Sequence, residues 1–188
     1  MKSFVFYFIF LSFFISGILF ANDEDTPEQI QNEIEHDRRL LIKSPDNAII
    51  LNRLGFNLYR QGKDDEAFNL FNRTIKLNPN LSTPYNNLGV IFLKRRDYIK
   101  AEYNFNISAQ LDSNSAKPLY NLAVTYFRQK KYWQAAKTYL KSKNTDGSYV
   151  KQRYNKTKAK NEINNLLKED PDNEYLLKIS KELDKNEP

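Results

Sequence analysis

The sequence contains no cysteine and a single histidine, His36. The lack of cysteine excludes disulfides, thiolate metal sites, a cysteine nucleophile and a lipidated N-terminal cysteine. One histidine excludes any site that needs two, and the five glycines form no phosphate-binding pattern. The nucleophile motif Gly-x-Ser-x-Gly is also absent. We therefore expect no enzyme, no metal site and no cofactor.

Residues 1–21 differ in composition from the rest of the chain. An uncharged run over residues 4–20 holds seven of the 13 phenylalanines, and Ala21 precedes an acidic stretch. This pattern is typical of a secretory signal peptide that is cleaved after Ala21. Against cleavage, Leu19 is large for its position, and the run is close to the shortest that spans a bilayer. We expect an exported protein of the periplasm or cell envelope, in which residues 1–21 are either cleaved or kept as an anchor. A buried core helix is the remaining alternative.

The middle of the chain is built on a spacing of 34 residues, and residues of one kind recur at each step. Small residues recur where helices must approach closely, and aromatic residues recur beside them. The recurring sets are Leu51, Tyr85 and Leu119; Leu54, Leu88 and Leu122; Gly55, Gly89 and Ala123; Leu58, Phe92 and Tyr126; Ala67, Ala101 and Ala135; Phe71, Phe105 and Tyr139; and Thr74, Ser108 and Ser142.

This pattern resembles the tetratricopeptide repeat (TPR) family, whose 34-residue unit runs from a large residue through Leu-Gly, Ala and an aromatic to a closing Pro. The resemblance implies an all-α, right-handed helical solenoid. It places three repeats at 48–81, 82–115 and 116–149, and the third loses the pattern after Ser142. A capping helix within 22–47 and capping helices within 150–188 would close the two ends.

Local signals predict where the capping helices begin. Thr26 followed by Pro27 is typical of an N-cap and first turn, and the helix is expected to run to about Lys43. Ser148 is expected to cap a helix that ends near Lys168. A last helix is expected over about 173–184, where Leu176, Ile179 and Leu183 have helical spacing.

The resemblance also implies a ligand-binding groove lined by the first helix of each repeat, in which a protein or peptide partner would lie. Alternatively, the apolar members of this set pack against neighbouring helices, and Asn87 and Asn121 only tie helices together. The predicted groove residues are Asn52, Phe56, Tyr59, Arg60, Asn86, Asn87, Val90, Leu93, Lys94, Tyr120, Asn121, Val124, Phe127 and Arg128.

Positive charge is concentrated in residues 128–160, which hold 11 basic residues and one acidic residue. Such a block favours an anionic membrane surface, polymer or acidic partner; alternatively, its lysines only solvate the helices. No nucleic-acid recognition motif accompanies it, so we expect no nucleic-acid partner. The candidate surface residues are Lys130, Lys131, Lys137, Lys141, Lys151, Arg153, Lys156, Lys158 and Lys160.

Two interpretations follow. The first is an exported TPR adaptor or scaffold that binds a protein or peptide through the groove, within a cell-envelope complex. The alternative is a peripheral, envelope-organising protein that docks to anionic lipid or polymer through residues 128–160. The sequence also leaves self-association through residues 149–188 open.

Overall fold

The computed structural model describes residues 26–153, 156–174, 176–177 and 180–181, so the predicted signal peptide lies outside the described residues. The chain divides into two compact units. Asn22–Ser113 forms the N-terminal unit, and Asn114–Pro188 belongs to the C-terminal unit. The described residues contain helices and no β-strand. None of the described helices is both long and apolar enough to cross a membrane.

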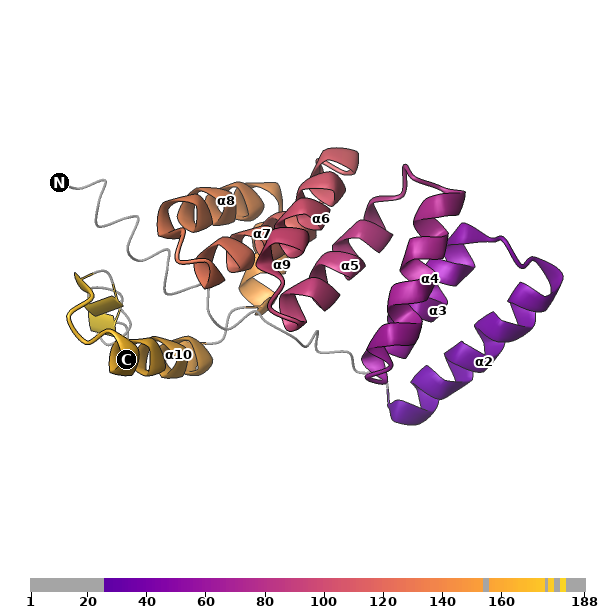
Figure 1. Cartoon of the computed structure of the whole chain (residues 1–188), viewed down its shortest axis with the longest axis horizontal. Helices are drawn as coiled ribbons and strands as arrows, with labels where there is room; N and C mark the ends of the chain where they lie inside the picture. The colour runs from indigo at the N-terminus through magenta and orange to yellow at the C-terminus, as the bar shows by residue number, and fades with distance from the viewer. Residues whose placement is uncertain (1–25, 154–155, 175, 178–179, 182–188) are drawn as a thin grey trace. The chain divides into compact units, whose positions relative to one another are not determined.

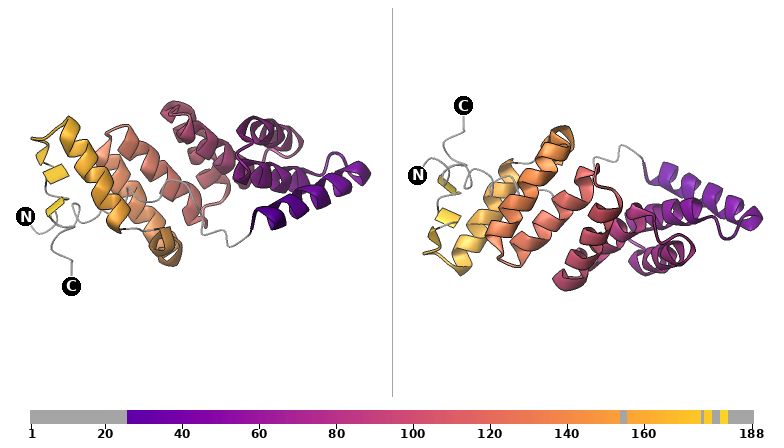
Figure 2. Two further views of the ribbon diagram at one scale, coloured as in Figure 1. Left: turned by 90° about the horizontal axis from the view of Figure 1, so that it is seen from below. Right: turned by 90° about the horizontal axis from the view of Figure 1, so that it is seen from above.

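The helices are arranged as antiparallel pairs within each unit (Figures 1 and 2). In the N-terminal unit α3 pairs with α4 and α5 with α6, while α2 packs on α3 and α4 on α5. In the C-terminal unit α7 pairs with α8, and α9 packs on both. The helices are α2 (Pro27–Lys43), α3 (Ala48–Arg60), α4 (Asp64–Leu77), α5 (Ser82–Lys94), α6 (Tyr98–Leu111), α7 (Ala116–Arg128), α8 (Tyr132–Thr145), α9 (Gly147–Arg153) and α10 (Lys156–Glu169).

One turn is repeated three times, between the two helices of each pair. Its central residue has positive φ: Gly62 at 80°, Arg96 at 61° and Lys130 at 61°. In all three turns the following amide donates a 2.9 Å hydrogen bond to the carbonyl five residues earlier. This is a Schellman motif, which ends a helix by satisfying its last carbonyl groups. The 34-residue spacing in the sequence is therefore reproduced in the backbone.

The helix α2 ends as the second helices of the repeats do. The amide of Ser44 donates to the carbonyl of Leu40 at 3.0 Å, as the amide of Asn78 does to Thr74 at 2.8 Å after α4. The start of α2 confirms the predicted cap, because Thr26 forms a capping box with Gln29. The C-terminal end of α2 thus resembles that of the second helix of a repeat.

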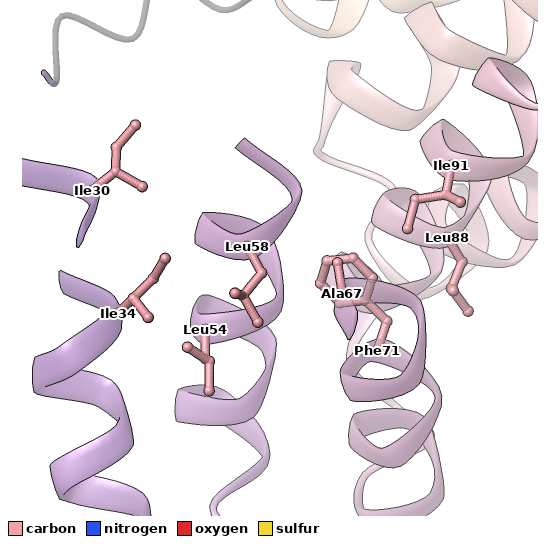
Figure 3. Packing of buried hydrophobic residues seen from close by; sticks show 8 residues of the cluster. All are labelled: Ile30, Ile34, Leu54, Leu58, Ala67, Phe71, Leu88 and Ile91. Carbon is pink, nitrogen blue, oxygen red and sulfur yellow. The ribbon is translucent and has the colours of Figure 1, made fainter. Parts of the chain in front are cut away.

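Apolar side chains from four consecutive helices form the core of the N-terminal unit (Figure 3). The aromatic member of this core is Phe71 of α4, which is fully buried. The small residue at the matching position of each first helix makes room for such a ring. The cluster comprises Ile30 and Ile34 of α2, Leu54 and Leu58 of α3, Ala67 and Phe71 of α4, and Leu88 and Ile91 of α5.

The end of the third repeat differs from the sequence prediction. Asp146 rather than Ser148 caps the next helix, because its carboxylate accepts hydrogen bonds from the amides of Ser148 and Tyr149, both at 3.0 Å. The stretch expected as one helix to Lys168 contains α9, described to Arg153, and α10, described from Lys156, and residues 154–155 between them lie outside the described residues. Of the last predicted helix, Leu176 is buried, whereas Ile179 and Leu183 lie outside the described residues.

Candidate functional site

The predicted groove residues of the N-terminal unit divide into a surface set and an interior set. Asn86 and Leu93 are buried, so these two predicted groove residues belong to the packing between helices. The others are half-buried, apart from the exposed Lys94. They occupy one side of two adjacent helices, which we call the α3–α5 face. Its members are Asn52, Phe56, Tyr59 and Arg60 of α3 and Asn87, Val90 and Lys94 of α5.

Two amides join the helices at one end of this face. Asn87 Nδ2 donates to Asn52 Oδ1 at 3.4 Å, and Asn86 Nδ2 donates to Asn87 Oδ1 at 3.4 Å. Both bonds are longer than the roughly 2.9 Å typical of such pairs, so each is weak. The Asn52–Asn87 bond therefore ties α3 to α5, and the two amides that it joins are half-buried.

A cation and an aromatic ring lie together at the other end of the α3–α5 face. Lys94 Nζ is 2.6 Å from Asp64 Oδ2 and 5.5 Å from the centre of the Tyr59 ring. On α3 the guanidinium carbon of Arg60 is 5.8 Å from the Phe56 ring centre. Both distances are in the range of cation–π contacts. This end of the face thus presents two positive charges beside apolar rings.

The hydroxyl of Tyr59 is buried and has no hydrogen-bond partner among the residues that the structure describes. Burial, assisted by the charge of Asp64, raises the pKa of Tyr59 to about 12. The hydroxyl therefore stays protonated at neutral pH and keeps a proton to donate. Asp64 lies in the first turn of α4. No periodic signal in the sequence links it to Lys94, 30 residues later.

Two acidic residues of α2 that share a helix face are used to fix α2 on α3. Asp37 is fully buried, and Arg53 Nε donates to both of its carboxylate oxygens at 3.0 Å. Glu33 accepts a 2.9 Å hydrogen bond from Asn57. These pairs account for the two carboxylates as structural groups. Among the described residues, no group of three or more His, Cys, Asp or Glu side chains is placed to hold a metal ion.

The structure does not place the predicted groove residues of α7 on a surface. Tyr120, Asn121, Val124 and Phe127 are all buried, and only Arg128 is half-buried. For Tyr120 one cause is α9, which packs on α7 and brings the Tyr149 ring edge-on to it at 6.0 Å. The ring of Phe127 instead packs against Tyr132 of α8 at 5.4 Å. The prediction that these four side chains line a groove is therefore wrong. Their burial agrees with the packing alternative that the sequence left open.

The predicted basic surface is described only in part. Lys130, Lys131, Lys137 and Lys141 are exposed, and Lys160 is half-buried. The side chains of Lys151, Arg153, Lys156 and Lys158 lie outside the described part of the chain. The described part of this basic surface is therefore that of α8 and the turn before it.

Comparison with known proteins finds that part of the chain is similar to a known repeat family. Two sequence profiles described as "Tetratricopeptide repeat" match residues 48–81 and 70–103. The protein ycf37 of Porphyra purpurea is 30% identical over 94 residues, which are 48% of this chain and 54% of that protein. The chain therefore spans about half the length of this relative.

Two solved structures show the same all-α repeat fold. "MamA 41-end from Desulfovibrio magneticus RS-1" has a TM-score of 0.63 at 15% identity, over 84% of this chain and 85% of that one. "First TPR of Spaghetti (RPAP3) bound to HSP90 peptide SRMEEVD" has a TM-score of 0.53 at 22% identity, over 72% and 92%. At these identities the likeness establishes the fold. The predicted all-α TPR solenoid is confirmed.

Proposed function

Because residues 48–103 are tetratricopeptide repeats, we propose that the chain is an adaptor that holds an extended segment of a partner protein on its α3–α5 face. Repeats of this class use the surfaces that they build by stacking to bind other molecules. The RPAP3 repeat domain, which shares the fold, is described as bound to a peptide. We propose that this chain binds a peptide in a similar way, without implying that it binds the same peptide.

The observation that carries the proposal is the pair Asn52–Asn87. Both amides are half-buried on the surface, and the 3.4 Å bond between them is weak. An extended peptide has unpaired amide and carbonyl groups along its backbone. The side-chain amides of Asn52 and Asn87 can hydrogen-bond to these groups in place of their weak bond to each other. Phe56 and Val90 lie between the amide pair and the cationic end, where they would cover apolar side chains of the peptide.

The cationic end of the α3–α5 face favours peptides that carry an acidic residue. Arg60 and Lys94 bring two positive charges to the last turns of α3 and α5, and Asp64 offsets one of them. A carboxylate of the peptide placed there would gain charge-assisted hydrogen bonds. We therefore expect segments with an apolar part and an acidic residue to bind best.

We further propose that the adaptor works outside the cytoplasm, in the periplasm or cell envelope. The support is the sequence of residues 1–21, with its uncharged run over 4–20 and Ala21 before an acidic stretch. N-terminal sequencing of the chain recovered from its cells tests this. A mature chain starting at Asn22 supports export with cleavage, and a cytoplasmic chain starting at Met1 contradicts export.

Selection from a random peptide library on the purified chain tests the binding proposal. We expect the selected peptides to bind the unchanged chain. Asn87→Ala or Val90→Gln should weaken their affinity by about tenfold, which equals about 1.4 kcal/mol. The matched control is Ile99→Gln on α6, where the side chain is 80% exposed and outside the α3–α5 face. Equal weakening by the control, or none by either face variant, would contradict the proposal.

A further inference from the structure

The solvent-facing side of α8 carries the chain's single tryptophan, Trp133. Its side chain is 61% exposed, an unusual position for so large an apolar ring. Lys137 and Lys141 follow at intervals of four residues and are both exposed. Residues four apart lie one above another on a helix. The three side chains therefore form one row, which we call the α8 stripe.

The stripe lies in a part of the chain whose positive charge is hardly neutralised from within. Residues 116–153 contain nine basic residues and one acidic residue, Asp146. The carboxylate of Asp146 is engaged at the start of α9, where it also accepts a 2.7 Å hydrogen bond from the Ser148 hydroxyl.

Two helices of the C-terminal unit, α7 and α9, pack on α8. The helices α7 and α9 contain no acidic residue. One acid from beyond α10, Asp170, lies near Tyr132, and together with burial it raises the pKa of the Tyr132 hydroxyl. The ring of Tyr132 packs against Phe127 of α7 at 5.4 Å, on the side of α8 that faces α7. The stripe is thus a cationic row with an aromatic ring at one end.

The geometry points to a membrane-docking surface, in which the α8 stripe lies on an anionic lipid bilayer with Trp133 in the interface. Tryptophan favours the membrane–water interface, because its ring is apolar and its indole N–H is polar. Each lysine close to such a surface is attracted by anionic headgroups. This inference goes beyond the proposed peptide binding and does not depend on it.

The composition of the stripe favours lipid over the other anionic partners. Recognition of a fixed carboxylate or phosphate favours arginine, whose planar group binds two oxygens at once, and the stripe has none. Binding of single-stranded nucleic acid uses several aromatic platforms along a groove, and the stripe has one ring. Flexible, well-hydrated lysines with one interfacial aromatic suit the diffuse charge of a lipid surface.

Intrinsic fluorescence of the full chain tests this directly, because its tryptophan emission comes from Trp133 alone. The probe is vesicles of phosphatidylglycerol and phosphatidylcholine, compared with pure phosphatidylcholine. We expect a blue shift, and quenching by brominated lipid, only with the anionic vesicles, both reversed by high salt. An apolar N-terminal segment that remained on the chain would insert into both kinds of vesicle, so it cannot produce this difference.

Charge variants decide whether the stripe itself is responsible. Lys137→Gln with Lys141→Gln should lower the partition coefficient for anionic vesicles by about 25-fold, from about fivefold per lysine. The matched control is Lys43→Gln with Lys76→Gln, two exposed lysines of α2 and α4. This control lowers the net charge by the same amount as the stripe variant, and it should leave the blue shift with anionic vesicles unchanged. Equal loss in the control, or a blue shift with neutral vesicles, would overturn the inference.

Other anionic partners provide the remaining arms of the test. Polyglutamate and single-stranded polyuridylate are titrated into the same protein at the same salt concentration. We expect neither to change the emission at concentrations where the anionic vesicles saturate it. A response of Trp133 to either polymer without a response to vesicles would overturn the lipid assignment.

Discussion

The ring of Phe71 lies directly against the Cα of Gly55, where a Cβ atom would be 2.8 Å from Phe71 Cε1. The same relationship recurs 34 residues later, where a Cβ at Gly89 would be 2.5 Å from Phe105 Cε1. A buried phenylalanine of the second helix therefore occupies the space that a side chain of the first helix would need. This contact fixes how closely α3 approaches α4 and α5 approaches α6.

Gly89→Ala should destabilise the N-terminal unit by about 1–3 kcal/mol, because the added methyl group forces a buried ring to move. The better helix propensity of alanine offsets only about 1 kcal/mol of this cost. Thermal and urea unfolding measure the effect, and Gly89→Ala with Phe105→Leu should recover part of the loss. The control is Gly147→Ala, where no atom lies within 4 Å, and it should be neutral or stabilising. A stable Gly89→Ala variant would contradict the packing described here.

Arg96→Gly should stabilise the chain by about 1 kcal/mol. Arg96 has a φ of 61°, in the left-handed region, and this conformation has a higher free energy for a residue with a side chain than for glycine. The equivalent position of the first repeat already holds Gly62. Arg96→Ala is the control, since it removes the same side chain but keeps the backbone cost. The comparison uses urea unfolding, and equal stability of the two variants would show that the backbone at this turn carries no strain.

Arg53→Met should destabilise the chain by about 2–4 kcal/mol, because it leaves the buried carboxylate of Asp37 without its partner. The hydrogen bond to Asp37 also raises the pKa of Arg53. Asp37→Asn together with Arg53→Met should cost less than the sum of the single changes. The control is Arg73→Met, whose exposed pair with Asp46 should be worth less than about 1 kcal/mol. An additive double variant would show that the Asp37–Arg53 pair is not coupled.

The stability of the N-terminal unit should depend on pH above 10 through Tyr59. Its pKa in the folded chain is about 12, above the ordinary 10.0, mainly because the hydroxyl is buried. The stabilisation that follows is fully present below pH 10 and is lost as the pH rises through 12. Urea unfolding between pH 9 and pH 12 should therefore show a smaller loss for Tyr59→Phe than for the unchanged chain. Identical losses would contradict the burial of this hydroxyl.

The sequence predicted those features that repeat with the 34-residue period. Gly55, Gly89 and Ala123 indicated close helix contacts, because a periodic fold imposes the same requirement at each step. Arg96 and Lys130 adopt the turn of Gly62 although neither is a glycine. The hydrogen bonds at the end of each first helix thus decide the positive φ at this turn. The residue type at the turn alone does not predict it.

The sequence could not predict contacts that occur only once. Tyr120 appeared to belong to a groove by its register, but Tyr149 of the short α9 covers it. The pair Lys94–Asp64 depends on how two long side chains reach across from separate helices, which no spacing encodes. Asp146 precedes the predicted cap Ser148 by two residues, and local sequence favours both as caps. These are the places where tertiary packing overrides the pattern.

Site-specific photo-crosslinking in living cells is the measurement that tests the adaptor assignment most directly. Benzoylphenylalanine is placed either at Val90 on the α3–α5 face or at Ile99, the exposed side chain on α6. The account predicts that position 90 crosslinks to one defined protein and that position 99 does not. Asn87→Ala should reduce the product. Equal crosslinking from both positions, or none from position 90, would contradict a binding role for this face.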